Sequence, residues 1–139
     1  MKYGSLIFKK ENFVMIKYYQ EMNGMLENYV HKNTLDILTD NMSEALIVDR
    51  DDIPTDIVQI YSTVTLSSTC GWHETLQLVP PYEENIKNDK ISVISTLGAS
   101  VVGLSEGDTI RYGLTGNVLL LKIEKVVQSR TQIELNISE

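Results

Sequence analysis

The sequence predicts a small α+β protein in which two N-terminal helices precede an antiparallel sheet that carries one short helix. Two patterns favour this class: apolar residues recur every three or four positions before Asp51, and they alternate with polar residues after Pro54. The acidic run ending at Pro54 marks the change, because aspartate and proline are poor residues for continuing a helix. With 139 residues, the chain suits one domain, or one small domain with a helical appendage. We therefore predict a short antiparallel helical hairpin over 1–52 and a sheet domain over 53–139.

Residues 1–52 contain two stretches with helical periodicity. The apolar face of the first helix consists of Val14, Met15, Tyr18, Met22, Leu26 and Tyr29. Asn23-Gly24 is expected to break that helix. A second helix is predicted over 34–47, where Asn33 or Thr34 can cap the first turn. Its apolar seam consists of Leu35, Leu38, Met42 and Ala45, and we expect the two seams to pack together.

Residues 53–139 alternate between short strands and turns. We predict strands at 62–66, 73–79, 91–94, 109–112 and 117–127, with a further edge strand at 131–137. A short helix is expected over 97–102, because Ser95 or Thr96 can cap its start and Gly103 can end it. These elements predict a small antiparallel sheet with one helix packed on it.

Charge and composition disfavour several classes of protein. The chain has 12 basic and 19 acidic residues, and no basic cluster exceeds the pair Lys9-Lys10, so direct nucleic-acid binding is not expected. No apolar run approaches the roughly 20 residues of a membrane helix. The apolar start, Met1 to Phe8, is too short for a secretory signal. The single cysteine, Cys70, excludes an internal disulfide. We expect a soluble cytoplasmic protein whose oligomeric state the sequence does not give.

Residues suited to metal binding or nucleophilic catalysis are sparse. Cys70 and His73 have the C-x2-H spacing of half a zinc site, but the one other histidine is His31 and there is no second cysteine. The same two residues suggest a thiol–imidazole pair, yet the neighbouring carboxylate, Glu74, would point to the opposite face of a strand. The glycines form no phosphate-binding loop. We therefore expect no metal, no cofactor and no catalytic residue.

Acidic side chains gather in the predicted hairpin. Asp36, Asp40 and Glu44 are spaced four apart and would share one face of a helix, and Glu27 lies in the link at 23–33. Like charges on one face cost stability, which would make sense if a cation or a basic partner faced them. The alternative is a solvated helix face, and both interpretations remain open at this point.

The second half of the chain resembles a known family over residues 53–128. The resemblance is carried by an ordered set of segments: Ile53-Pro-Thr-Asp-Ile-Val58, Ser62-Thr-Val-Thr-Leu66, Lys90-Ile-Ser-Val-Ile-Ser-Thr-Leu-Gly98, Ala99-Ser-Val-Val-Gly-Leu104 and Glu106-Gly-Asp108. This order is similar to the C-terminal domain of the GreA/GreB transcription elongation factors. It resembles most closely the short Rnk-like members, regulators of nucleoside diphosphate kinase.

The resemblance implies an FKBP-like fold and binding to RNA polymerase at the entrance of its secondary channel. In that family an N-terminal hairpin with acidic residues at its tip enters the channel and stimulates cleavage of backtracked RNA. Here a helix over 34–47 would span about 20 Å, which is much shorter than the hairpins of that family. The tip holds one acid, Glu27. Thr96 stands where the family usually has proline, and Ala99 where many members have a basic residue.

We therefore expect a polymerase-binding regulator that is not an enzyme and does not stimulate transcript cleavage. The resemblance makes Ser95, Thr96, Leu97 and Gly98 the candidate docking segment. One alternative is a cleavage-stimulating factor that uses Glu27, Asp36 and Asp40. Another is an FKBP-like prolyl isomerase, which needs an aromatic-lined pocket, whereas the second half has one Trp, three Tyr and no Phe.

Overall fold

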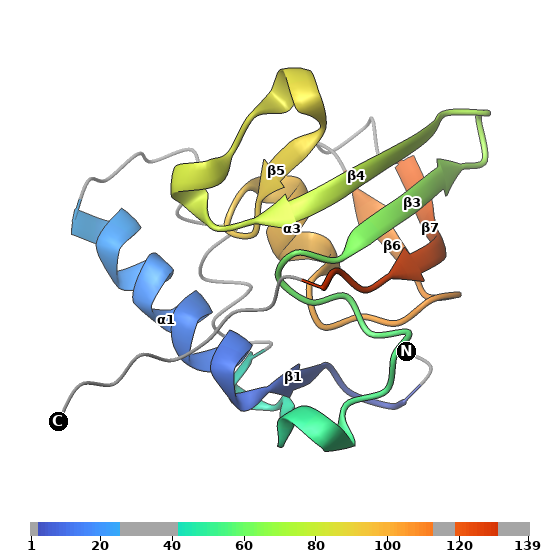
Figure 1. Ribbon diagram of the computed structural model, residues 1–139. Coiled ribbons are helices and arrows are strands. Elements are labelled where there is room, and N and C mark those ends of the chain that lie inside the picture. Colours follow the sequence, from blue (N-terminus) through green and yellow to red (C-terminus); the bar gives the residue numbers. More distant parts are fainter. Residues whose placement is uncertain (1–2, 26–41, 113–118, 131–139) are drawn as a thin grey trace, which may run out of the picture.

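A computed structural model describes residues 3–25, 42–112 and 119–130, and it confirms the α+β class (Figure 1). The helices and strands are β1 (Ile7–Lys9), α1 (Lys10–Met25), β2 (Leu46–Val48), β3 (Thr63–Ser68), β4 (His73–Val79), β5 (Lys90–Ser92), α3 (Thr96–Val101), β6 (Thr109–Tyr112) and β7 (Leu119–Val127). Three 3-10 turns, η1 (Arg50–Asp52), η2 (Pro81–Glu83) and η3 (Ile86–Asn88), complete the described part. Within these ranges no helix is long and apolar enough to cross a membrane.

The main sheet has five strands in the order β5-β4-β3-β7-β6. Its strands pair antiparallel except for β5, which runs parallel to β4 with Gln77 opposite Lys90. The prediction of a purely antiparallel sheet is therefore wrong at this edge. The connection from Pro80 to Asp89 makes two 3-10 turns, η2 and η3, so the chain re-enters the sheet in its original direction instead of closing a hairpin.

One face of this sheet forms the core. Val64 and Leu66 of the central strand β3 and Ile123 of its neighbour β7 are fully buried. They share a cluster with Val101 of α3 and Ile16 of α1. Alternate residues of β3 point to the other face, as the two-residue period of a strand requires.

A second, two-stranded sheet joins the two ends of the N-terminal region. β1 and β2 pair in parallel, with Phe8 opposite Ile47. Ile7 also donates its backbone N–H to the carbonyl of Gly103 at 3.1 Å, which connects the two-stranded sheet to the segment after α3. Sequence reasoning assigned no strand to residues 7–9, and it placed residues 46 and 47 in a helix. The predicted helix over 34–47 is wrong at its end; residues 26–41 lie outside the described part.

α1 buries a different face from the predicted one. Ile16 and Tyr19 are buried, whereas Val14 and Tyr18 are 42% and 50% exposed. Asn12 accounts for this difference in the buried face. Its Oδ1 accepts the backbone N–H of Ile60 at 2.7 Å, so the side of α1 that carries Asn12 packs against the sheet domain. The helix also continues through Asn23-Gly24 to Met25, so the predicted break at that pair is wrong.

Candidate partner-binding site

The predicted docking segment forms the first turn of α3, and Ser95 caps it. The Ser95 Oγ accepts the backbone N–H of Gly98 at 3.1 Å and donates to the carbonyl of Ser92 at 2.6 Å. The first bond satisfies one of the free N–H groups at the helix start. The predicted helix is confirmed one residue earlier than expected, at Thr96–Val101, and of the two predicted caps Ser95 is the one observed.

Gly98 lies where α3 comes closest to β5. A Cβ atom at this position would lie 2.1 Å from the carbonyl oxygen of Ser92 and 3.0 Å from the Cα of Val93. Gly98 is buried, while Thr96 and Leu97 are partly exposed. Two residues of the predicted segment, Ser95 and Gly98, thus hold the turn together. Thr96 and Leu97 are partly exposed, and Leu97 also packs against the core.

The turn at 105–108 holds β6 and β7 in place. The Asp108 Oδ2 accepts the backbone N–H of Ser105 at 2.9 Å and lies 3.0 Å from its hydroxyl. Gly107, at φ +94°, donates its N–H to the carbonyl of Ile123 at 2.7 Å. The Glu106 Oε1 accepts the N–H of Val126 at 3.0 Å, beyond the irregular pairing in β7. This Glu-Gly-Asp string therefore has a structural role.

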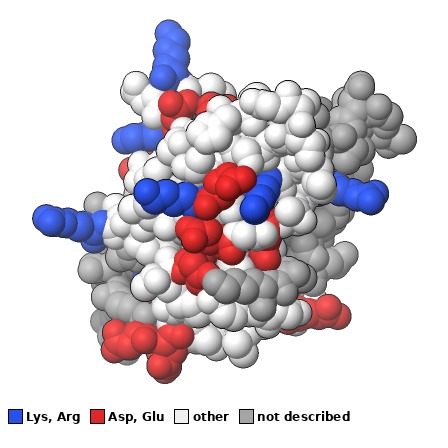
Figure 2. Space-filling view, turned by 90° about the vertical axis from the view of Figure 1, so that its right-hand side faces the viewer, with Lys and Arg blue, Asp and Glu red and all other residues white. Residues whose placement is uncertain are grey.

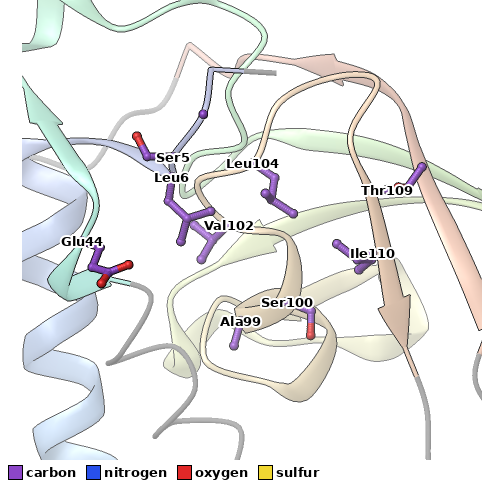
Figure 3. Close-up of a pocket in the computed structure, with 10 residues that line it drawn as sticks. Ser5, Leu6, Glu44, Ala99, Ser100, Val102, Leu104, Thr109 and Ile110 are labelled. Atoms are coloured by element: carbon purple, nitrogen blue, oxygen red, sulfur yellow. The ribbon is translucent and has the colours of Figure 1, made fainter. Parts of the chain in front are cut away.

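A cavity of about 420 Å³ lies beside α3, between the N-terminal segment and β6 (Figure 3). Its apolar lining consists of Leu6, Ala99, Val102, Leu104 and Ile110. Its polar lining consists of Ser5, Glu44, Ser100 and Thr109. Sequence reasoning missed this cavity, because it forms only when β1 brings residues 4–6 against the segment after α3.

Comparison with known proteins identifies the family. Residues 53–128, more than half of the chain, match the family profile described as "Transcription elongation factor, GreA/GreB, C-term". The chain belongs to the GreA/GreB family. It is 29% identical over 93 residues to the transcription elongation factor GreA of Syntrophus aciditrophicus (strain SB), covering 66% of this chain and 57% of that protein. It is 32% identical over 93 residues to GreA of Syntrophobacter fumaroxidans, covering 66% and 56%.

The chain thus spans little more than half the length of these GreA relatives. Among solved structures, it is similar to the "Prokaryotic transcription elongation factor GreA/GreB from Nitrosomonas europaea", with a TM-score of 0.72 and 24% sequence identity. That alignment covers 88% of this chain and 98% of the other, which indicates a shared fold. The closer resemblance to the short Rnk-like members stays a prediction.

The acidic residues that bear on Gre-type chemistry are only partly placed. Glu44 is exposed in the turn that follows Met42 and Ser43 and leads into β2. The other three, Glu27, Asp36 and Asp40, lie outside the described residues. In residues 3–25, 42–112 and 119–130, no three His, Cys, Asp or Glu side chains come together as metal ligands.

Cys70 lies at the tip of the β3–β4 hairpin, and His73 begins β4; both are exposed. The Cys70 Sγ is 3.0 Å from the Oγ of Ser68, which also accepts the N–H of Trp72 at 3.1 Å. The Ser68 hydroxyl and backbone N–H groups of the turn stabilise the thiolate and lower the pKa of Cys70 below its usual value.

We expect the lowered pKa to show as faster alkylation of Cys70 by iodoacetamide near neutral pH. A lower pKa leaves more thiolate at any pH below it, and the thiolate is the reacting form. Ser68→Ala should slow the reaction about twofold to threefold, because it removes the hydroxyl beside the sulfur. Thr69→Ala, in the same turn, is the control. Equal rates in folded and urea-unfolded protein would contradict the expectation.

Acidic and basic side chains interleave on the face shown in Figure 2. Lys and Arg side chains border a central group of Asp and Glu on that face, and they do not merge into a continuous basic area. This pattern agrees with the net charge of −7.

Proposed function

We propose that this chain binds RNA polymerase at the entrance of the secondary channel and regulates transcription without stimulating transcript cleavage. The observation that carries the proposal is the family match over residues 53–128. The GreA relatives are named transcription elongation factors, which supports polymerase as the partner. In this proposal the chain is a cytoplasmic binding protein and not an enzyme.

The sheet domain supplies the docking surface in this proposal. Thr96 and Leu97 are partly exposed on the first turn of α3, and that turn is fixed by the Ser95 cap and by the close packing of Gly98. A rigid turn loses little conformational freedom when it binds, so a small apolar anchor there contributes more affinity. We further propose that residues 53–139 form an FKBP-like domain and that residues 1–52 complete a short helical hairpin.

The proposed absence of cleavage activity is supported by the short reach of the N-terminal region. α1 has 16 residues and is therefore about 24 Å long. The chain has only 16 further residues between Met25 and Met42 with which to extend a hairpin and return. A hairpin of this length is too short to reach an active centre buried inside the polymerase. Glu27 is also the one acid in the predicted tip at 23–33. A cleavage factor that uses Glu27, Asp36 and Asp40 remains the alternative, followed by an FKBP-like prolyl isomerase.

Competition on purified RNA polymerase tests the proposal. We expect the chain to bind the polymerase and to be displaced by GreA, and we expect no added RNA cleavage on stalled complexes. Thr96→Arg should weaken binding about tenfold or more, because it places a long charged side chain in the docking turn. Thr69→Arg, which makes the same change at the exposed β3–β4 turn, should not.

The assay separates the alternatives. Competitive binding with stimulated cleavage would replace our proposal with the cleavage-factor alternative. Failure to bind would contradict both, and a peptide isomerisation assay would then test the isomerase alternative. Equal loss of binding in Thr96→Arg and Thr69→Arg would show that the start of α3 is not the docking turn.

A further inference from the structure

The cavity beside α3 combines an apolar floor with one charged side chain. Figure 3 shows Glu44 on one side of the cavity and Thr109 and Ile110 on the other, with Leu6 and Val102 between them. Among the lining residues that the structure describes, Glu44 is the one with a formal charge. A ligand that matches this lining must therefore be apolar along its length and positive at one end.

The carboxylate of Glu44 is the charged group that such a ligand would meet. Glu44 is exposed, and no hydrogen bond or ion pair joins it to another residue within the described ranges. Ser5 and Thr109 also line the cavity. The Ser100 hydroxyl, in contrast, already donates to the carbonyl of Thr96 at 2.7 Å.

We propose that this cavity receives an arginine side chain of the polymerase, an inference that rests on the proposed function. The aliphatic stem would lie along Leu6, Ala99 and Val102, and the guanidinium would meet the carboxylate of Glu44. Arginine fits better than lysine, because its planar fork pairs with both oxygens of a carboxylate and is more weakly hydrated. The net charge of −7 favours the approach of a basic segment.

The size of the cavity agrees with this occupant. Its volume of about 420 Å³ lies within the roughly 300–1,000 Å³ typical of ligand sites. The space is therefore sufficient for one long side chain together with part of its own backbone. The cavity also adjoins Ser100 on α3, the helix that begins with Thr96 and Leu97, so one partner can contact both the cavity and the start of that helix.

Titration of the ¹⁵N-labelled full chain with Nα-acetyl-arginine amide tests the proposal directly. We expect shifts of the amide signals of Ala99, Ser100 and Thr109, and no comparable shifts with the uncharged isostere Nα-acetyl-citrulline amide. Glu44→Gln should weaken arginine binding about threefold to tenfold, because it removes the charge that pairs with the guanidinium. Glu21→Gln is the matched control, since Glu21 is an exposed acid on α1 that does not line the cavity.

A second variant fills the cavity without changing its charge. Ala99→Met should abolish the arginine-induced shifts, and thermal unfolding would verify that the variant is folded. In the polymerase assay, Glu44→Gln should weaken binding about threefold to tenfold and Glu21→Gln should not.

Equal binding of the arginine and citrulline probes, or equal binding by Glu44→Gln and the original chain, would overturn the proposal. Polymerase binding that is unaffected by Glu44→Gln and Ala99→Met would overturn it too, while leaving the proposed function intact. If the arginine probe binds but the polymerase does not, the chemistry of the cavity holds and the polymerase is excluded as its partner.

Discussion

Gly98→Ala is expected to lower the free energy of unfolding by about 3–5 kcal/mol. The added methyl group would lie 2.1 Å from the backbone carbonyl oxygen of Ser92, and a backbone atom cannot move away as a flexible side chain can. α3 must therefore shift away from β5, which also disturbs the Ser95 cap. Thermal unfolding followed by circular dichroism should show a midpoint at least about 10 °C lower.

Gly71→Ala provides a matched control for this change. Gly71 lies in the β3–β4 turn at φ +94°, and nothing lies within 4 Å of the position its Cβ would occupy. Its replacement should therefore cost about 1 kcal/mol, from backbone conformation alone. If the two variants lost the same stability, the close packing of α3 on β5 would not be the reason that glycine is needed at position 98.

Local patterns predicted the sheet domain well, because its signals lie close together in the sequence. β4 was predicted with its observed bounds, and Ser95 was one of two hydroxyl residues, with Thr96, predicted to cap a helix before a short apolar run. The parallel pair β1–β2 could not be predicted in this way. Each strand has three residues, and 36 residues separate Lys9 from Leu46. Neither an alternating apolar pattern nor a turn signal therefore indicates that the two strands pair.

Only part of the candidate site could be predicted from the sequence, for the same reason. The turn 95–98 was found because its residues are contiguous. The cavity forms only where Leu6, Glu44 and Ile110 lie close together in the fold. The pairing of β1 with β2 brings Leu6 and Glu44 into that region. The rotation of α1 was missed because a buried polar side chain, Asn12, sets it, whereas apolar periodicity favoured the stripe through Val14 and Tyr18.

Phe8→Ala is expected to destabilise the sheet domain, although residue 8 lies far from it in the sequence. Phe8 is 2% exposed, and its ring lies so close to Gly103 that a Cβ there would be 2.8 Å from the nearest ring carbon. Its ring also meets Phe13 edge-on, with centroids 6.1 Å apart. Removing a buried phenylalanine ring costs about 3–5 kcal/mol, so the urea midpoint should fall clearly.

Two spectroscopic probes test whether residues 1–52 and 53–139 unfold separately. The single tryptophan, Trp72, reports on the sheet by fluorescence, and far-ultraviolet circular dichroism reports on the helices, of which α1 is the longest in the described residues. We expect both transitions to move together, because Phe8 packs on the segment after α3. Leu46→Ala, on the neighbouring strand, should change the midpoint little, since Leu46 is 53% exposed. An unchanged Trp72 transition in Phe8→Ala would instead show that residues 53–139 are stable without the contact from β1.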